Sequence, residues 1–216
     1  MLENINYSLF AFLNATPASP WWAIEIATFI AKDLIIIVPL LVFALWLWGP
    51  NQRQLVFKVM MALAISLTLS WIFACFFPHE RPFAAGVGYN FLHHSPNNSF
   101  PSNHGTICFT FALAFMFWHR LWSGALLIAV ACAIAWSRVY LGVHWPMDML
   151  GGLLTAMIAC LSAQLLWQSG GKTLYQHLQR LYRLFFSLPI RKRLGARIDV
   201  PDQPVKLRQR PIPARD

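Results

Sequence analysis

The sequence predicts an all-α membrane protein, a polytopic bundle of about five to six transmembrane helices. Of its 216 residues, 57% are hydrophobic and only 12% are charged. An average soluble domain is roughly half apolar and about a quarter charged, and a chain of this length has too small an interior to hide the surplus. The mean hydropathy of +0.51 agrees. An ordinary soluble protein is therefore excluded.

Five apolar stretches predict the membrane spans. A helix needs about 20 residues to cross the hydrocarbon core, so the third and fourth stretches are short unless their flanks lengthen them. Several stretches end in Trp, as is typical of the membrane interface. The stretches cover residues 21–48, 54–77, 104–118, 121–136 and 147–167.

Basic residues are concentrated near the C-terminus. Eleven of the 17 Lys and Arg lie at or after Lys172, against three acidic residues there. A basic tail beside an apolar body favours a cytoplasmic anchor under the positive-inside rule. Within the tail we expect a basic amphipathic helix over 171–197 and a disordered segment from Pro201. A nucleic-acid-binding arm is the less favoured alternative, and no nucleic-acid partner is expected.

The same features divide the chain into three parts. We expect residues 1–20 to form a periplasmic or interfacial segment, starting with a short amphipathic helix, residues 21–168 the membrane-embedded domain, and residues 169–216 the basic cytoplasmic tail. If the tail is cytoplasmic, the loops at 78–103 and 137–146 both lie at the external face. The polar groups of these two loops therefore meet at one end of the bundle.

Those two loops hold nearly all the polar functional groups outside the tail. Arginine binds phosphate oxygens through two parallel hydrogen bonds, and histidine can act as a nucleophile or as an acid and base. The loops therefore predict a phosphate site. Their polar segments are Arg81-Pro82, Pro101-Ser102-Asn103-His104-Gly105, and Ser137-Arg138 followed by His144 and Asp148.

Helix geometry supports a phosphate site. Ser102 or Asn103 is the expected N-cap of the third span, which directs backbone N–H groups and the positive end of the helix dipole toward an anion. Pro146 suits the first turn of the fifth span. His144 and Asp148 are four residues apart, so the carboxylate can hold one ring nitrogen and leave the other exposed.

These motifs resemble the three signatures of the type 2 phosphatidic acid phosphatase superfamily. Their order, spacing and placement relative to the spans match over about residues 20–168, and the Ser137-Arg138, His144, Asp148 motif is the most specific. The sequence is most similar to the BcrC-type undecaprenyl-diphosphate phosphatases. The opening MLENINYSLFAFLNATP and the IAKDLI stretch resemble an enterobacterial member of that branch.

The resemblance implies a role for each residue. His144 is implied to attack the terminal phosphorus and form a phosphohistidine, Asp148 to orient His144, and His104 to protonate the leaving group and then activate water. No metal or other cofactor is implied, because arginines and amides supply the positive field. The four cysteines lie in apolar stretches without CxxC spacing, so we expect neither metal binding nor disulfides. The residues implied to bind the substrate phosphate are Arg81, Ser102, Arg138 and Gly105.

One position departs from the family pattern. The first motif usually begins with a lysine seven residues before the arginine, and that position here is Ala74. Lys32, inside the first span, is a candidate to replace it, since a charge within a span is costly and often functional. A packed polar pair of Lys32 with Asp33 is the favoured alternative. His79, His93 and His94 are interpreted as solvated loop residues.

The resemblance also implies an activity. The protein is expected to hydrolyse undecaprenyl diphosphate to undecaprenyl phosphate and phosphate at the periplasmic face of a bacterial inner membrane. This reaction recycles the carrier lipid of peptidoglycan synthesis and confers bacitracin resistance. The alternatives are a broad phosphatidylglycerophosphate or phosphatidate phosphatase, a lipid phosphotransferase, and a non-catalytic channel or transporter subunit. The sequence leaves the oligomeric state open.

Overall fold

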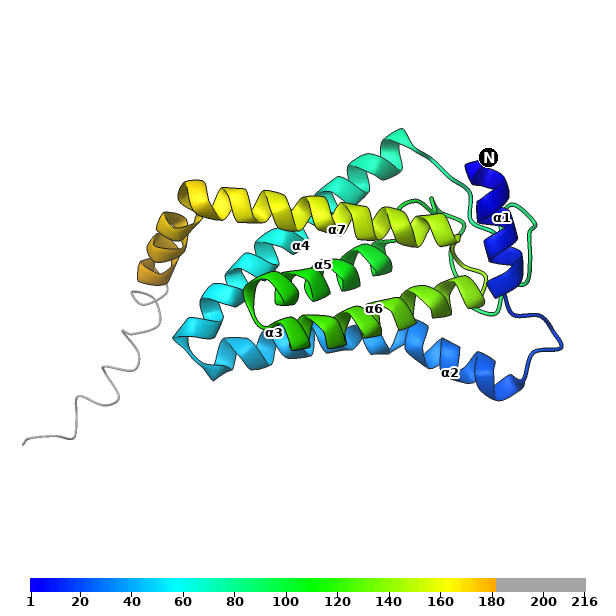
Figure 1. Ribbon diagram of the computed structural model, residues 1–216, viewed down its shortest axis with the longest axis horizontal. Coiled ribbons are helices and arrows are strands. Elements are labelled where there is room, and N and C mark those ends of the chain that lie inside the picture. The colour runs from blue at the N-terminus through cyan, green and yellow to red at the C-terminus, as the bar shows by residue number, and fades with distance from the viewer. Residues whose placement is uncertain (182–216) are drawn as a thin grey trace, which may run out of the picture. The chain divides into compact units, whose positions relative to one another are not determined.

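The computed structural model describes residues 1–181, apart from the side chains of residues 50 and 51. All regular structure in this range is helical, which confirms the all-α expectation (Figure 1). The chain divides into two units, Met1–Tyr175 and Gln176–Asp216, and the first contains the helix bundle. The disordered segment expected from Pro201 lies outside the described residues, as does most of the amphipathic helix expected over 171–197.

Nine helical elements follow one another along the described chain. They are α1 (Leu2–Leu13), α2 (Trp21–Lys32), η1 (Leu34–Ile36), α3 (Ile37–Trp48), α4 (Pro50–Phe76), α5 (Asn103–Trp118), α6 (Leu121–Tyr140), α7 (Pro146–Leu166) and η2 (Trp167–Gly171).

The first predicted span is interrupted. The stretch expected to be one helix over 21–48 consists of α2, the short 3₁₀ turn η1 and α3. Pro39 explains the break, because proline has no N–H to donate to the carbonyl of Ile35 and its ring crowds that carbonyl. The hydrogen-bond ladder therefore tightens into a 3₁₀ turn around Ile35 before α3 continues.

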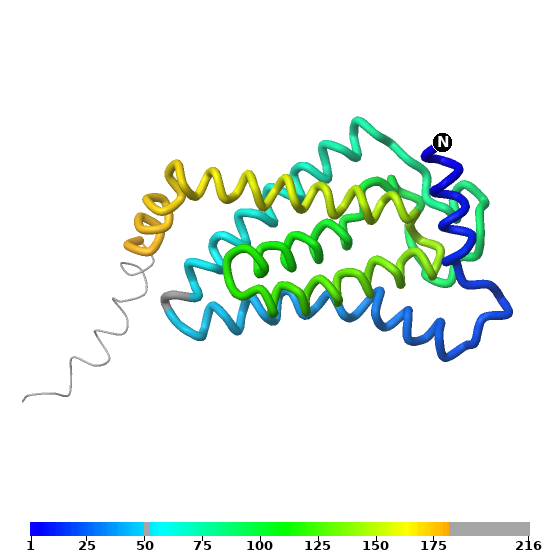
Figure 2. Tube along the Cα trace, in the orientation of Figure 1, coloured from blue at the N-terminus to red at the C-terminus, as the bar shows by residue number. Residues whose placement is uncertain are grey.

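Four helical stretches are long and apolar enough to cross a membrane: Trp21–Trp48, Gln52–Phe76, Leu121–Tyr140 and Pro146–Leu181. With 16 residues, α5 is shorter than these. It packs against α4, α6 and α7 (Figure 2). Nearly all of its residues from Gly105 to Phe115 are buried. Its neighbours therefore cover α5, and it needs little lipid-facing surface.

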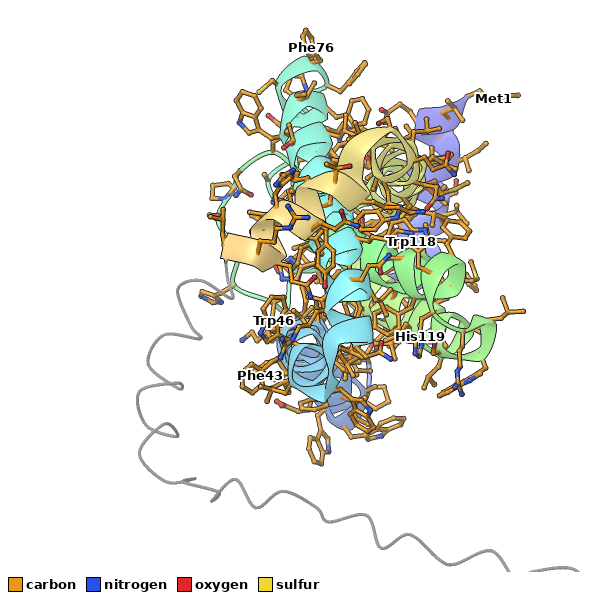
Figure 3. All side chains as sticks on the ribbon, turned by 90° about the vertical axis from the view of Figure 1, so that its left-hand side faces the viewer. Met1, Phe43, Trp46, Phe76, Trp118 and His119 are labelled. Carbon is orange, nitrogen blue, oxygen red and sulfur yellow. The ribbon has the colours of Figure 1, made fainter. Side chains whose placement is uncertain are left out.

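The outside of the bundle is apolar. Phe43 is 62% exposed and Phe76 is 76% exposed, and both project away from the helices in the view along the bundle (Figure 3). Exposed aromatic and aliphatic side chains on this scale mark a surface in contact with lipid. Together with the four apolar stretches, they identify a membrane protein.

The connections alternate between the two ends of the bundle. The α3–α4 and α5–α6 turns lie at one end, whereas the 77–102 loop and the 141–145 turn lie at the other (Figure 1). The expected meeting of the two polar loops is therefore confirmed. The helix α1 covers this end, where Asn14 Nδ2 donates to the carbonyls of Tyr89 (2.9 Å) and Tyr140 (3.0 Å).

Candidate active site

The start of α7 places the first two candidate residues. Gly142 adopts a φ of 80°, and a Cβ at this position would collide with the carbonyl oxygen of Tyr89. Only glycine fits such a turn without strain. The chain then enters α7 at Pro146, with Trp145 as N-cap, and the Trp145 N–H donates to Asp148 Oδ2 at 2.8 Å.

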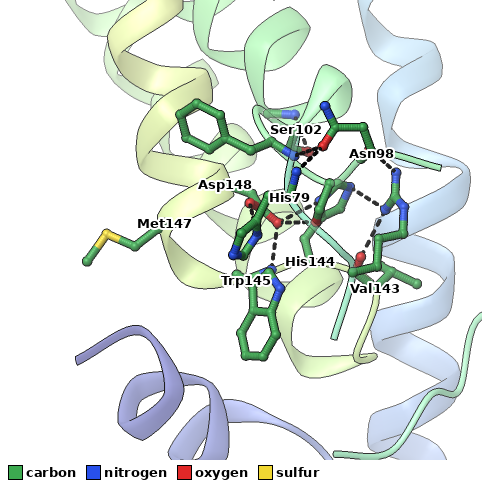
Figure 4. Close-up of polar contacts among 12 residues, drawn as sticks. His79, Asn98, Ser102, Val143, His144, Trp145, Met147 and Asp148 are labelled. Carbon is green, nitrogen blue, oxygen red and sulfur yellow. Dashed lines mark hydrogen bonds and ion pairs between the residues drawn. The ribbon is translucent and has the colours of Figure 1, made fainter. Parts of the chain in front are cut away.

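His144 and Asp148 form a buried pair. His144 Nδ1 lies 3.1 Å from Asp148 Oδ2, and the side chains are only 2% and 1% exposed. On the other side of the ring, Arg81 Nη1 lies 3.0 Å from His144 Nε2 (Figure 4). Because arginine can only donate, Nε2 accepts, and the proton of the neutral ring belongs on Nδ1, facing Asp148.

The surroundings keep this imidazole neutral. Burial lowers the pKa of His144 to about 4, although the hydrogen bond and charge of Asp148 act in the opposite direction. The positive charges of Arg138 and Arg81 lower the pKa further. A neutral ring with its lone pair on Nε2, beside a guanidinium group, is suited to attack an electrophile such as phosphorus.

Arg81 ties the two loops together. Its Nε donates to the backbone and side-chain oxygens of Asn97 (3.1 and 3.0 Å), its Nη2 to the carbonyl of Asn98 (3.3 Å), and its Nη1 to the carbonyl of Val143 (2.9 Å). Burial lowers its pKa, and the charge of Asp148 opposes this. Arg81 therefore holds the 77–102 loop against the turn that carries His144.

Arg138 differs from Arg81 in its free hydrogen-bonding capacity. Its Nη1 donates to the carbonyl of Ala31 at 3.2 Å, but Nε and Nη2 are buried without a hydrogen-bond partner among the described residues. Buried donors of this kind are rare, because leaving them unpaired costs free energy. A phosphate oxygen pair matches two guanidinium N–H groups.

The first turn of α5 completes the cluster. Ser102 is the N-cap, and its Oγ accepts from the Gly105 N–H at 3.3 Å. The expected capping role is therefore confirmed, whereas a phosphate contact from Gly105 or Ser102 stays a prediction. The Ser102 N–H donates to the carbonyl of Asp148 at 3.1 Å, which joins α5 to α7. His104 is half-buried and within electrostatic reach of Arg138 and His144.

Sequence reasoning missed Ser99. Its hydroxyl donates a short hydrogen bond to Asp148 Oδ2 and lies 3.3 Å from His144 Nδ1. Ser99 is completely buried. The only signal in the sequence is the density of polar residues from 95 to 104, which marks a loop but not one residue within it.

The interpretation of three loop histidines as solvated was partly wrong. His79 is half-buried and its Nδ1 lies 4.0 Å from Asp148 Oδ1. The ring centre of His94 lies 6.3 Å from that of His144. Only His93 is exposed as expected. The irregular path of the 77–102 loop brings His79 and His94 inward. The path of an irregular loop cannot be predicted from hydrophobic periodicity.

Ala74, which stands where the family motif has a lysine, contributes a backbone hydrogen bond instead of a charge. The carbonyl of Ala74 accepts from Asn98 Nδ2 at 2.6 Å. Lys32 is exposed and lines a cavity beside Asp33 and Ile107. No ion pair between Lys32 and Asp33 is present in the described part of the chain. A role for Lys32 in phosphate binding therefore stays a prediction.

Residues 1–181 contain no group of three or more His, Cys, Asp or Glu side chains that could hold a metal ion. That the reaction needs no metal ion stays a prediction, to be tested by measuring activity in the presence of EDTA.

Several known proteins are similar to this chain in sequence or in fold. A family model described as the PAP2 superfamily matches residues 51–171. The chain is 65% identical over 193 residues to the putative undecaprenyl-diphosphatase YbjG of Escherichia coli, covering 89% of this chain and 98% of that protein. It is 28% identical over 155 residues to the undecaprenyl-diphosphatase BcrC of Bacillus subtilis, covering 71% and 80%.

Two solved structures share the arrangement of helices. LpxE of Aquifex aeolicus superposes with a TM-score of 0.64 and 26% identity, covering 74% of this chain and 94% of that one. The first transmembrane PAP2 type phosphatidylglycerolphosphate phosphatase from Bacillus subtilis superposes with a TM-score of 0.57 and 17% identity, covering 78% and 87%. The second likeness concerns the fold alone.

Proposed function

Because the chain belongs to the PAP2 superfamily, we propose that it hydrolyses undecaprenyl diphosphate to undecaprenyl phosphate and phosphate. The observation that carries this proposal is the setting of His144. Its Nδ1 faces Asp148 Oδ2 at 3.1 Å, and its Nε2 faces Arg81 Nη1 at 3.0 Å. The relatives named for this activity in Escherichia coli and Bacillus subtilis support the choice of substrate.

The first chemical step forms a phosphohistidine. The terminal phosphate binds the free N–H groups of Arg138 and takes the place of the Arg81–Nε2 contact. The Nε2 lone pair attacks phosphorus, and the bond from phosphorus to the bridging oxygen breaks. Burial and the nearby cations lower the pKa of His104 to about 3 in the free site, and the negative charge of the bound diphosphate raises it. Protonated His104 then gives its proton to the departing undecaprenyl phosphate. Asp148 accepts the Nδ1 hydrogen bond and stabilises the positive charge that develops on the ring.

The second step returns the enzyme to its starting state. His104, now without its proton, takes one from water, and the resulting hydroxide oxygen attacks the phosphorus. The phosphorus–Nε2 bond breaks, the electron pair returns to His144, and phosphate leaves. Each proton given by His104 in the first step is regained in the second, so His104 acts as acid and then as base.

The location of the site suits a lipid substrate. The polar cluster lies at one end of an apolar bundle, so the diphosphate reaches the site while the polyprenyl chain stays in lipid. We place this end at the periplasmic face of a bacterial inner membrane, because most basic residues belong to the C-terminal part of the chain, which follows the opposite end of the bundle. Recycling of the carrier lipid there would confer bacitracin resistance.

The test is phosphate release by the detergent-purified full chain. Undecaprenyl diphosphate and phosphatidate are supplied in parallel, with EDTA present and His144→Ala as control. We expect faster release from the prenyl diphosphate, no effect of EDTA and no release by the variant. Preference for phosphatidate would replace the proposed substrate by a glycerolipid. Absence of release from both would overturn the hydrolase proposal.

A further inference from the structure

A second histidine lies behind the carboxylate of Asp148. His79 follows the end of α4, and its Nδ1 lies 4.0 Å from Asp148 Oδ1. Its Nε2 lies 3.7 Å from Glu3 Oε1, on α1. His79 and His144 lie on either side of Asp148 (Figure 4). Four segments of the chain thus contribute to one line of groups that runs from Glu3 through His79 and Asp148 to His144.

The two oxygens of Asp148 have unequal environments. Oδ2 accepts hydrogen bonds from His144 Nδ1, the Ser99 hydroxyl and the Trp145 N–H. Oδ1 is buried and has no hydrogen-bond partner within residues 1–181. A buried carboxylate oxygen favours a donor, because burial removes the water that would otherwise supply one. His79 Nδ1 is a ring nitrogen that faces this oxygen.

The surroundings hold His79 in place but leave its ring room to move. The ring meets Trp145 edge-on, with 6.0 Å between centres. Trp145 is itself fixed by the carbonyl of Glu80, which accepts from its Nε1 at 2.7 Å. A cavity of about 620 Å³ borders Glu3, His79 and Asp148. A ring shift of about 1 Å therefore brings Nδ1 to hydrogen-bonding distance.

The helix α1 fixes Glu3 beside this ring. Phe10 packs on Trp145, with 4.9 Å between ring centres, and Asn6 Oδ1 accepts from the Met147 N–H at 3.1 Å. These contacts join α1 to the first turn of α7. These contacts hold α1 against the end of the bundle that carries the site. Glu3 is exposed, and it stays near His79 because the helix that carries it is fixed.

We propose that His79 is a positioning residue that donates from Nδ1 to Asp148 Oδ1 and from Nε2 toward Glu3 Oε1, so that the two carboxylates orient its ring from opposite sides. A carboxylate held at both oxygens cannot rotate away from His144 when the charge of that ring changes during turnover. His79 touches neither phosphate nor lipid in this arrangement and acts through Asp148. The inference rests on the proposed function, since it assigns a role within that reaction.

Three substitutions of His79 separate its possible roles. In His79→Asn the amide nitrogen takes the place of Nδ1, in His79→Gln it takes the place of Nε2, and His79→Phe keeps a ring against Trp145 without a donor. We expect kcat to fall about tenfold in the Gln and Phe variants at unchanged KM, as for lost outer-shell partners elsewhere. His79→Asn should stay within about threefold of the wild type.

The matched control is His93→Gln, which alters an exposed histidine of the same loop and should leave kcat unchanged. Glu3→Gln should lower kcat by about twofold, since it removes only the orienting charge. A Phe variant as active as the wild type would overturn the inference, because packing alone would then suffice. An Asn variant as impaired as the Phe variant would overturn the assigned donor.

Hydrogen exchange supplies a second measurement that does not depend on turnover. The Trp145 N–H is bonded to Asp148 Oδ2, so a loosened carboxylate exposes this amide. We expect faster exchange over residues 141–150 in His79→Phe than in the wild type or His79→Asn. Equal exchange in all three proteins would overturn the positioning role. A wild type that releases no phosphate would overturn the proposed function, and the exchange experiment would still decide the role of His79.

Discussion

Two cations at opposite ends of the bundle, half-buried Lys58 and buried Arg138, differ in how their charge is stabilised. At the end away from the site, Lys58 Nζ donates to Gln164 Oε1 at 3.1 Å and lies 4.3 Å from the centre of the Trp118 ring. A second ring, that of Trp167, lies 5.6 Å away. At the other end, Arg138 donates to the carbonyl of Ala31, and within residues 1–181 its two other buried nitrogens have no partner.

The contrast supports the end that carries Arg138 as the proposed functional end. The aromatic rings and the amide stabilise the ammonium of Lys58, so this cation contributes to packing. Arg138 is buried at a cost that the protein alone does not offset, because charged donors need partners in a dry site. An anion that binds there supplies the missing hydrogen bonds. Unused donor groups therefore distinguish a proposed binding site from a cation whose hydrogen bonds and ring contacts the protein itself supplies.

The largest effect is expected when a histidine at the site is replaced and compared with a replaced histidine at the opposite end. His144→Ala removes the nucleophile and should lower kcat about 10⁴-fold or more, as loss of a nucleophile or its partner does in other hydrolases. His119→Ala changes an exposed histidine at the opposite end, hydrogen-bonded to Ser123, and should retain wild-type kcat. Phosphate release measures both. Comparable losses in the two variants would contradict the assignment of the catalytic end.

Next in size is the loss of the free donors. Arg138→Met should lower kcat/KM about 10²- to 10³-fold, the range for removing a donor that stabilises transition-state charge. The unfolding temperature in detergent should stay level or rise, because an uncompensated buried charge disappears. A variant with normal kcat/KM and a lower unfolding temperature would place Arg138 in the same structural class as Lys58.

A smaller effect on kcat/KM is expected from a change in pH. Since the folded pKa of His144 is about 4, the nucleophile stays neutral as pH falls through 6.5, the usual pKa of histidine. We therefore expect kcat/KM, corrected for ionisation of the substrate measured by ³¹P NMR, to hold to pH 5 and to reach half its plateau near pH 4. An acid limb centred at pH 6.5 would contradict the burial of this ring.

The same shift predicts a change in stability. Between pH 6.5 and pH 4 the unfolded chain binds a proton that folded His144 does not, so the free energy of unfolding decreases as pH falls through this window. The unfolding temperature of the wild type should therefore drop more steeply across it than that of His144→Gln. Parallel curves for the two proteins would contradict the prediction.

The smallest change in activity is expected from Lys58→Met. This substitution removes the hydrogen bond to Gln164 and the contact with Trp118. The loss amounts to about 1–2 kcal/mol of folding free energy. A fall of a few degrees in unfolding temperature with kcat within about twofold of the wild type would sharpen the contrast with Arg138. A large loss of turnover would abolish it.

The sequence predicted the parts of the molecule that depend on local pattern. Apolar runs located the bundle, and the four-residue spacing predicted the contact between His144 and Asp148, which the structure shows at 3.1 Å between Nδ1 and Oδ2. The family resemblance is confirmed by the PAP2 match over residues 51–171. The break at η1 was missed, although Pro39 was visible, because one proline within a long apolar run does not fix where a helix breaks.

Other features depend on contacts between distant segments. Ser99 and His79 reach Asp148 only because the irregular 77–102 loop folds back over α7. The unused donors of Arg138 depend on which of its nitrogens reaches Ala31, 107 positions away. Neither helix period nor motif spacing encodes such distances. Sequence reasoning therefore located the polar cluster and the pairing of His144 with Asp148 but missed the groups that orient them.

The shortness of α5 determines the depth of the site. Its 16 residues measure about 24 Å, against about 30 Å for the 20 residues of α6. Only residues 119 and 120 separate the two helices, so α5 ends and α6 begins at nearly the same level, at the end of the bundle away from the site. At the site, the N-terminus of α5, with Ser102 and His104, is thus recessed by about 6 Å relative to the C-terminal end of α6. In the proposed function, a lipid headgroup can therefore reach His104 and His144 without being lifted out of its leaflet.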